Sequence, residues 1–192
     1  MSNSESFNRP LETDKLAEQR IEDARLRDMF EQRLKAYRNK ENKLETVYSD
    51  ELEIGMEVSE TVEVTEDLIT AFAVFSEDVN PIHVDDEYAK GTRFHERILH
   101  GAYSLNVISK LLGTRLPGVG TIFGGLTDLN FHAPVKVGDT LTTYVQVAAI
   151  GEKGKVTFDV GAKVGNVDVV TAKAFVIAPR KKIEPNQSRP ES

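Results

Sequence analysis

Asp78 and His83 are the two side chains whose types and spacing best suit acid–base chemistry in this sequence. They lie in a polar stretch, Ser76-Glu77-Asp78-Val79-Asn80-Pro81-Ile82-His83, between two apolar segments. Pro81 directs Asn80 towards extended geometry, which predicts a fixed turn rather than a continuing helix and lets Asp78 and His83 face each other. A carboxylate and an imidazole in one small volume can hold and activate a water molecule. A structural reading stays open beside this one, in which Asp78 caps the next turn and His83 is an ordinary half-buried histidine.

Other catalytic chemistries have weaker support in this sequence. The chain contains no cysteine, which excludes thiol catalysis, disulfides and cysteine metal sites. It contains four histidines, and we expect His95, His100 and His132 not to be catalytic, although His100 can orient the loop or pack where the next helix begins. No pair of histidines has the short spacing on one helix that zinc hydrolases use. We therefore expect no metal site.

Length and charge exclude further classes of function. With 192 residues, the chain suits one compact domain with an appendage. Its formal net charge of -7 argues against a nucleic-acid partner, because phosphate binding needs a basic face. No apolar run is long enough to span a membrane, and the first residues, MSNSESFNRP, contain no apolar leader. We expect a cytoplasmic protein with no membrane partner.

One central helix and five strands are predicted for residues 49–180. A strand at Glu57–Val64 and a helix at Glu66–Phe75, with Thr65 as its N-cap, precede the polar loop. The most apolar helix follows the loop at Ala102–Leu112, with Gly113 as its stop. Four antiparallel strands complete the domain: Thr121–His132, Thr140–Ile150, Lys155–Val164 and Val167–Ile177. This order predicts an α+β fold in which an antiparallel sheet wraps around a central hydrophobic helix.

Residues 1–48 differ from this domain, because they are rich in charges of both signs. Between Asp14 and Tyr37 there is no Gly or Pro, and apolar residues recur at helical spacing, which predicts an amphipathic helical extension. Two roles stay open for this helix: it lies on its own domain, which is the general expectation, or it is an arm that contacts a partner. Residues 181–192 are predicted to be disordered from their composition.

The polar loop and its surroundings resemble a known enzyme family. The match begins at Phe72-Ala73, includes the whole loop, and continues through Val84-Asp85, Ala89, Phe94, Ile98-Leu99-His100-Gly101, Ser109, Leu116-Pro117-Gly118, Phe131, Ala133-Pro134-Val135 and Val137-Gly138-Asp139-Thr140-Leu141. On these motifs, from about Gly55 to Pro179, the sequence resembles the MaoC-like (R)-specific enoyl-CoA hydratases. It departs from their pattern at Glu77, where they commonly have Gly, and at Ala102-Tyr103, where they have Met-Leu.

The resemblance implies a fold, an activity and a site. It implies the hot-dog fold, with two such units paired as a homodimer or within a higher oligomer, and with acyl-CoA sites near their interface. The implied reaction is hydration of a 2-enoyl thioester to the (3R)-3-hydroxyacyl thioester, or its reverse, with no metal or organic cofactor. By position, Asp78 and His83 hold and activate the water, Gly101 donates its backbone N–H to the thioester oxygen, and Ser109 lies near the site.

Three further residues complete the predicted site. We expect Asn80, Ser109 and Tyr103 to contact the substrate, and we hypothesise that Tyr103 limits the length of the acyl chain. Glu77 places another carboxylate beside Asp78. If both pointed inward, one pKa would rise, but we expect an outward, solvated Glu77.

Other functions stay open at this stage. Hot-dog folds also serve acyl-CoA thioesterases, and a non-catalytic acyl-CoA-binding or assembly module would use the helical extension to bind a partner. The carrier of the acyl group is either CoA or acyl carrier protein. Lys110, Arg115 and Lys136 are candidates for binding the carrier's phosphates.

Overall fold

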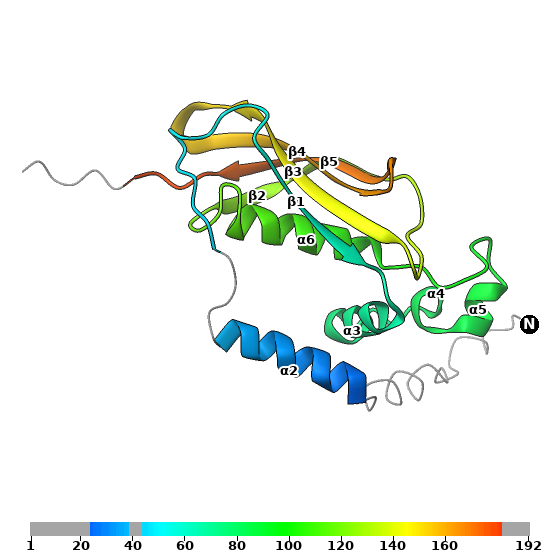
Figure 1. Ribbon diagram of the computed structural model, residues 1–192. Coiled ribbons are helices and arrows are strands. Elements are labelled where there is room, and N and C mark those ends of the chain that lie inside the picture. Colours follow the sequence, from blue (N-terminus) through cyan, green and yellow to red (C-terminus); the bar gives the residue numbers. More distant parts are fainter. Residues whose placement is uncertain (1–23, 39–43, 182–192) are drawn as a thin grey trace, which may run out of the picture.

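The fold is a five-stranded antiparallel sheet that curves around one helix (Figure 1). The computed structural model describes residues 24–38 and 44–181. Its strands are β1 (Glu57–Glu63), β2 (Ile122–Phe131), β3 (Thr140–Ile150), β4 (Lys155–Val164) and β5 (Val167–Ile177), in the sheet order β1-β3-β4-β5-β2. The helices are α2 (Ala24–Arg38), α3 (Glu66–Ser76), α4 (Pro81–Val84), α5 (Asp86–Lys90) and α6 (Gly101–Thr114). This arrangement confirms the predicted α+β architecture.

The apolar side of α6 forms the centre of the core. Its buried residues recur at helical spacing and include Ile108, Leu111 and Leu112, which are fully buried. The inner side chains of the sheet cover them, and these belong to alternate positions of the strands: Leu141, Val145 and Val147 on β3, Val156, Phe158 and Val160 on β4, and Ala172, Ala174 and Val176 on β5. Each such burial contributes about 1.5–3 kcal/mol for a large aliphatic side chain. The core therefore fixes α6, and with it the position of its first residues.

The structure corrects the predicted ends of several elements. Helix α6 begins at Gly101 and continues through Gly113 to Thr114, since one glycine is tolerated in a packed helix and Pro117 lies beyond its end. The strands predicted at β3, β4 and β5 have the observed bounds, whereas β1 and β2 are slightly shorter than predicted. In β2 the pairing with β5 shifts register twice, so this edge strand is irregular and leaves Ile122, Phe123, Leu129 and Phe131 exposed.

The predicted fixed turn at residues 76–83 was wrong in its second half. Residues 81–84 form one turn of helix, α4, and α5 follows at once. Asn80 caps α4 by accepting from the N–H of Ile82 at 3.3 Å, and Asp85 caps α5 by accepting from the N–H of Tyr88 at 3.0 Å. Pro81 is well suited to the first helical position, where a missing N–H costs nothing.

Helix α2 is the described part of the predicted N-terminal helix, and it contacts α3. The segment that follows is tied to the end of α6: the N–H of Glu45 donates to the carbonyl of Thr114, and the N–H of Val47 donates to the carbonyl of Pro117, both at 2.8 Å. These contacts favour a helix that lies on its own domain. The predicted helical residues 14–23 and the tail beyond residue 181 lie outside the described residues, so the domain boundaries stay predictions. No helix among the described residues is long and apolar enough to cross a membrane.

Glu77 ends α3 in the left-handed region, with φ 58° and ψ 13°, and its side chain is exposed. A side chain in this region costs free energy that glycine does not pay. We expect Glu77→Gly to be more stable than Glu77→Ala by about 0.5–1 kcal/mol in urea unfolding. Both variants remove the same charge, so equal free energies of unfolding would show that the conformation of residue 77 carries no strain.

Candidate active site

Helix α3 and the turn that follows it place Asp78 beside the start of α6. Thr65 caps α3 by accepting from the N–H of Leu68 at 3.1 Å, which starts the helix with its apolar side towards the core. At the other end, the left-handed Glu77 turns the chain, and Asp78 Oδ1 accepts from the N–H of Asn80 at 3.2 Å. The Asp78 carboxylate is exposed and keeps further lone pairs for a ligand.

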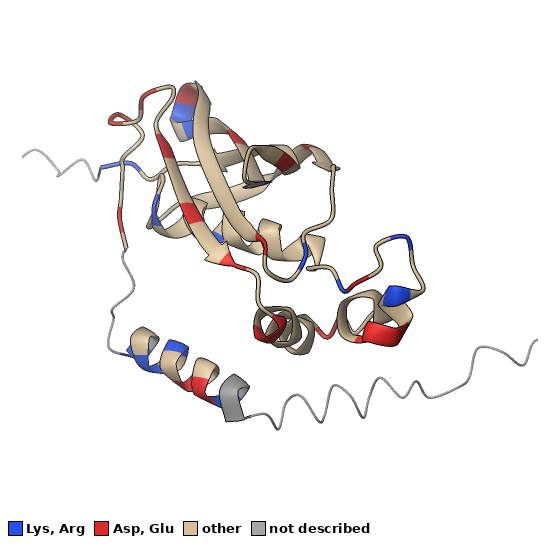
Figure 2. Ribbon diagram, turned by 45° about the vertical axis from the view of Figure 1, so that its right-hand side comes forward, with Lys and Arg blue, Asp and Glu red and all other residues tan. Residues whose placement is uncertain are grey.

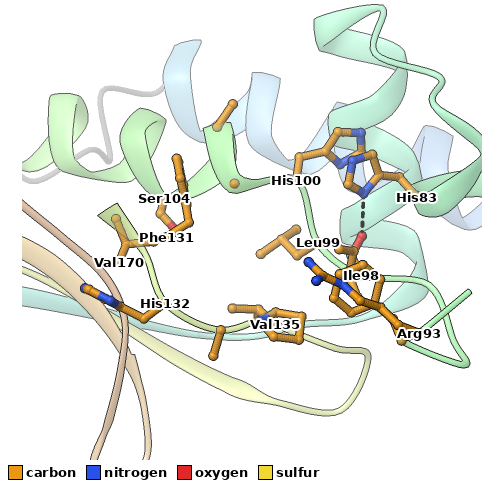
Figure 3. A pocket seen from close by; sticks show the side chains of 15 residues that line it. His83, Arg93, Ile98, Leu99, His100, Ser104, Phe131, His132, Val135 and Val170 are labelled. Atoms are coloured by element: carbon orange, nitrogen blue, oxygen red, sulfur yellow. Dashed lines mark hydrogen bonds between the residues drawn. The ribbon is translucent and has the colours of Figure 1, made fainter. Parts of the chain in front are cut away.

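A hydrogen bond to the backbone sets the orientation of His83. Its Nδ1 lies 2.7 Å from the carbonyl oxygen of Ile98 (Figure 3). A carbonyl only accepts, so Nδ1 carries the hydrogen, and in the neutral ring Nε2 is left with a lone pair. His83 can therefore act as a base, or as an acid once Nε2 is protonated.

Arg97 holds the segment that presents this carbonyl. Its side chain is buried, and its guanidinium pairs with Asp86 of α5 and, at 3.2 Å, with Glu66 of α3. Because the next residue is Ile98, these ion pairs tie α3 and α5 to the chain that leads into α6.

His100 links the two halves of the site. It is 2% exposed, its Nε2 donates to the backbone carbonyl of Asp78 at 2.9 Å, and its ring stacks on that of His83 with 3.8 Å between centroids. Burial lowers the pKa of His100, so the ring is neutral at physiological pH. The sequence interpretation left open that His100 orients the loop, and the structure supports that reading.

Gly101 brings a free backbone donor to the same place. It is the first residue of α6, and no side chain of the described residues caps this helix. The first amides of a helix have no carbonyl partner within it. A Cβ at residue 101 would lie 2.6 Å from Cε1 of Phe131, so any other residue here would displace the Phe131 ring. The amide end of α6 is therefore a site for a negatively charged or polarised oxygen.

A pocket of about 460 Å³ joins these groups (Figure 3). Gly101, His83 and His100 line it together with Arg93, Phe94, Ile98, Leu99, Ala102, Ser104, Phe131, His132, Ala133, Pro134, Val135 and Val170. Its volume is in the range of small-molecule sites. Asp78 is not part of the lining, but its carboxylate and the ring nitrogens of His83 and His100 lie within 4.8 Å of one another.

The structure separates the other predicted site residues from this pocket. Asn80 uses its side chain to cap α4, and Tyr103 is buried edge-on against Phe72 with 5.5 Å between ring centroids. Ser109 is exposed on α6, eight residues or about 12 Å beyond Gly101. Ser104, one turn beyond Gly101, lines the pocket instead, and the sequence interpretation missed it along with Arg93. The spacing of one helical turn from Gly101 was the available signal for Ser104.

Comparison with known proteins identifies the family. The profile of the MaoC-like domain matches residues 49–169. The chain belongs to the MaoC-like domain family. Among curated relatives, the 3-hydroxybutyryl-CoA dehydratase of Methylorubrum extorquens is 37% identical over 139 residues, which cover 72% of this chain and 88% of the relative. The (R)-specific enoyl-CoA hydratase of Rhodospirillum rubrum is 40% identical over 135 residues, which cover 70% and 93%.

Solved structures agree with this membership of the MaoC-like family. The R-hydratase of Pseudomonas aeruginosa superposes with a TM-score of 0.68 at 36% identity, covering 78% of this chain and 97% of that one. The (R)-hydratase of Aeromonas caviae superposes with a TM-score of 0.63 at 38% identity, covering 67% and 98%. The hot-dog fold expected from the sequence is thereby confirmed.

The cluster of Asp78, His83 and His100 has donor atoms of the kind that bind metals. The expectation of no metal site rested on the spacing of histidines along one helix. This cluster instead combines residues from different elements. Its geometry suits a metal poorly, because ligand lone pairs lie in the ring planes, and the two rings are stacked with only 25° between their planes. Nδ1 of His100 is also buried, with no hydrogen-bond partner among the described residues. The arrangement of this MaoC-like site suits a water between Asp78 and His83 better.

The buried, neutral His100 predicts a pH dependence of stability. Its folded-state pKa is lowered, so below its ordinary pKa of 6.5 the unfolded chain binds more protons than the folded chain, and stability falls with falling pH. When the pH is lowered from 7 to 5, we expect the free energy of unfolding, measured in urea, to fall less for His100→Gln than for the native chain. The exposed His95→Gln is the control. A gap between native and His100→Gln free energies that stays constant with pH would contradict the prediction.

Proposed function

We propose that this chain catalyses the reversible hydration of trans-2-enoyl thioesters to (3R)-3-hydroxyacyl thioesters. The observation that carries the proposal is one pocket that contains the amide end of α6 at Gly101 and the imidazole of His83, whose Nε2 has no hydrogen-bond partner among the described residues. The relatives named above as a dehydratase and hydratases of this class support it. Because the reaction is reversible, metabolite levels decide its direction.

The reaction adds a hydroxyl group to C3 of the substrate and a proton to C2. Attack at C3 moves negative charge onto the thioester oxygen, and we assign the N–H of Gly101 to that oxygen. The positive end of the α6 dipole favours the same charge. A donor already in place for a developing oxyanion typically contributes about 3–4 kcal/mol to lowering the barrier.

We assign the water to Asp78 and His83. The carboxylate and Nε2 of His83 both accept hydrogen bonds, so together they orient a water and take one of its protons as it attacks. The addition also needs an acid that delivers a proton to C2, and a carboxyl–imidazole pair supplies a base and an acid in one place. Dehydration uses the same two groups in the opposite sense.

The acyl chain and the partner subunit complete the proposal. Leu99, Val135 and Val170 give the pocket an apolar wall for the start of the chain. The substrate contacts predicted for Asn80, Ser109 and Tyr103, and the limit that Tyr103 would set on chain length, stay predictions, because none of the three lines this pocket.

We also propose a homodimer through β2. This strand has one free edge and exposes four large apolar side chains, and Phe131 on it is 53% exposed beside the pocket. A second copy would cover them and put the two pockets near the interface. Cytoplasmic location stays a prediction.

Turnover of crotonyl-CoA by the purified chain, followed by loss of the enoyl absorbance, tests the activity. We expect hydration by the native chain and a loss of about 10²–10⁴-fold in kcat for Asp78→Asn and for His83→Gln, in keeping with removal of a general acid or base. Asp168→Asn, an exposed carboxylate of β5, is the matched control and should keep full activity.

Two results would oppose the proposal. Release of free CoA from a saturated acyl-CoA, without hydration of the enoyl form, would favour a thioesterase. Binding of enoyl-CoA without any turnover, unchanged by Asp78→Asn, would favour the non-catalytic module.

A further inference from the structure

The basic residues suggested by the sequence for the carrier's phosphates are already paired with carboxylates. Lys110 pairs with Glu60 at 2.5 Å, Lys136 pairs with Glu96 at 2.5 Å, and Arg115 pairs with Glu45 at 3.2 Å. None of the three lines the pocket that contains His83 and Gly101. They are therefore poorly placed to bind an anion attached to the substrate.

Arg93 differs from them in place and in pairing. It lies on the loop between α5 and α6, where Figure 2 shows basic positions. Among the residues that line the pocket, it is the one arginine, and no lysine is present. Among the described residues it has no carboxylate partner within ion-pair distance, and it is exposed. Its guanidinium lies over the ring of Phe94, 4.7 Å from the centroid, which restrains the long side chain.

We infer that Arg93 binds a phosphate group of the thioester carrier. This inference rests on the proposed function, because it assumes that an enoyl thioester places its reacting end at Gly101 and His83. Both CoA and acyl carrier protein attach the acyl group through a phosphopantetheine arm, so a phosphate lies on the side of the thioester away from the acyl chain. A guanidinium matches phosphate geometry with two parallel N–H donors.

The charge of the whole chain makes this contact more specific. With a net charge of -7, the chain as a whole repels a polyanionic carrier, whereas a guanidinium at the pocket, without a carboxylate partner among the described residues, attracts it. The phosphate is separated from the reacting carbon by the whole pantetheine arm, so a contact to it is the same in the ground state and the transition state. Its loss should therefore raise KM and leave kcat unchanged.

Three thioesters of one acyl group separate this role from others. Crotonyl-pantetheine has no phosphate, crotonyl-4′-phosphopantetheine has one, and crotonyl-CoA also has the nucleotide phosphates. For Arg93→Ala we expect KM for crotonyl-CoA to rise about tenfold with kcat changed by less than about twofold, and the kinetics with crotonyl-pantetheine to stay unchanged. Arg93→Lys should recover part of the loss, and Lys136→Ala is the control for removal of a nearby cation.

The phosphopantetheine substrate identifies the phosphate. An equal rise of KM with crotonyl-4′-phosphopantetheine assigns the contact to the phosphate that CoA and acyl carrier protein share, and a rise with crotonyl-CoA alone assigns it to the nucleotide part. A rise of the same size with crotonyl-pantetheine, or no rise with any substrate, would overturn the inference.

Direct binding separates this inference from the proposed function. If the native chain hydrates none of the three thioesters, the proposed function fails. Calorimetric titration with free CoA still tests Arg93, because the inference requires Arg93→Ala to bind CoA about tenfold more weakly than the native chain does. Equal affinities would overturn it.

Discussion

Burial of the apolar side of α6 against the sheet is the constraint on which the rest of the structure depends. The fully buried Ile108, Leu111 and Leu112 hold the helix along the inner face of the sheet. A helix held in this way cannot shift along its axis without opening the core. Its first residues therefore sit at a fixed point, where its amide end faces a pocket rather than bulk solvent.

The site is assembled from this fixed point by hydrogen bonds to backbone carbonyls. His100, the residue before Gly101, holds the carbonyl of Asp78, and His83 is held by the carbonyl of Ile98. Neither bond uses the atoms proposed for catalysis: the Asp78 carboxylate keeps lone pairs beside the one that accepts from the N–H of Asn80, and Nε2 of His83 faces away from the carbonyl that holds Nδ1. In the proposed mechanism, water activation and thioester polarisation therefore come from different elements, and His100 links these elements through its bond to the Asp78 carbonyl.

Regular elements were the part of the fold that the sequence predicted well. Alternation in β3, β4 and β5 and the 3.6-residue pattern in α6 are local signals, and the core enforces the same periods. The short helices α4 and α5 were missed because their formation depends on capping by single side chains, Asn80 and Asp85, more than on any apolar period.

Long-range contacts limited the prediction of the site. Asp78, His83 and Gly101 were predicted from their motifs, and the structure places His83 and Gly101 in one pocket with Asp78 beside it. Nothing local in the sequence indicates that His100 reaches the carbonyl of a residue 22 positions earlier. Nor does it indicate that Lys110, Arg115 and Lys136 each pair with a carboxylate, whereas Arg93 has no such partner in the described part of the chain. Which charges pair across a fold depends on its tertiary structure, and the local pattern of a single sequence does not show it.

In the proposed mechanism, Gly101 binds the thioester oxygen, and the Asp78–His83 pair binds and activates the water. A crystal structure of the Asp78→Asn variant with bound crotonyl-CoA tests it most directly. The account predicts the thioester oxygen about 3 Å from the backbone nitrogen of Gly101, with C3 facing a water bound to Nε2 of His83. A thioester oxygen that points away from Gly101, or a C3 atom on the side of the pocket opposite His83, would contradict it.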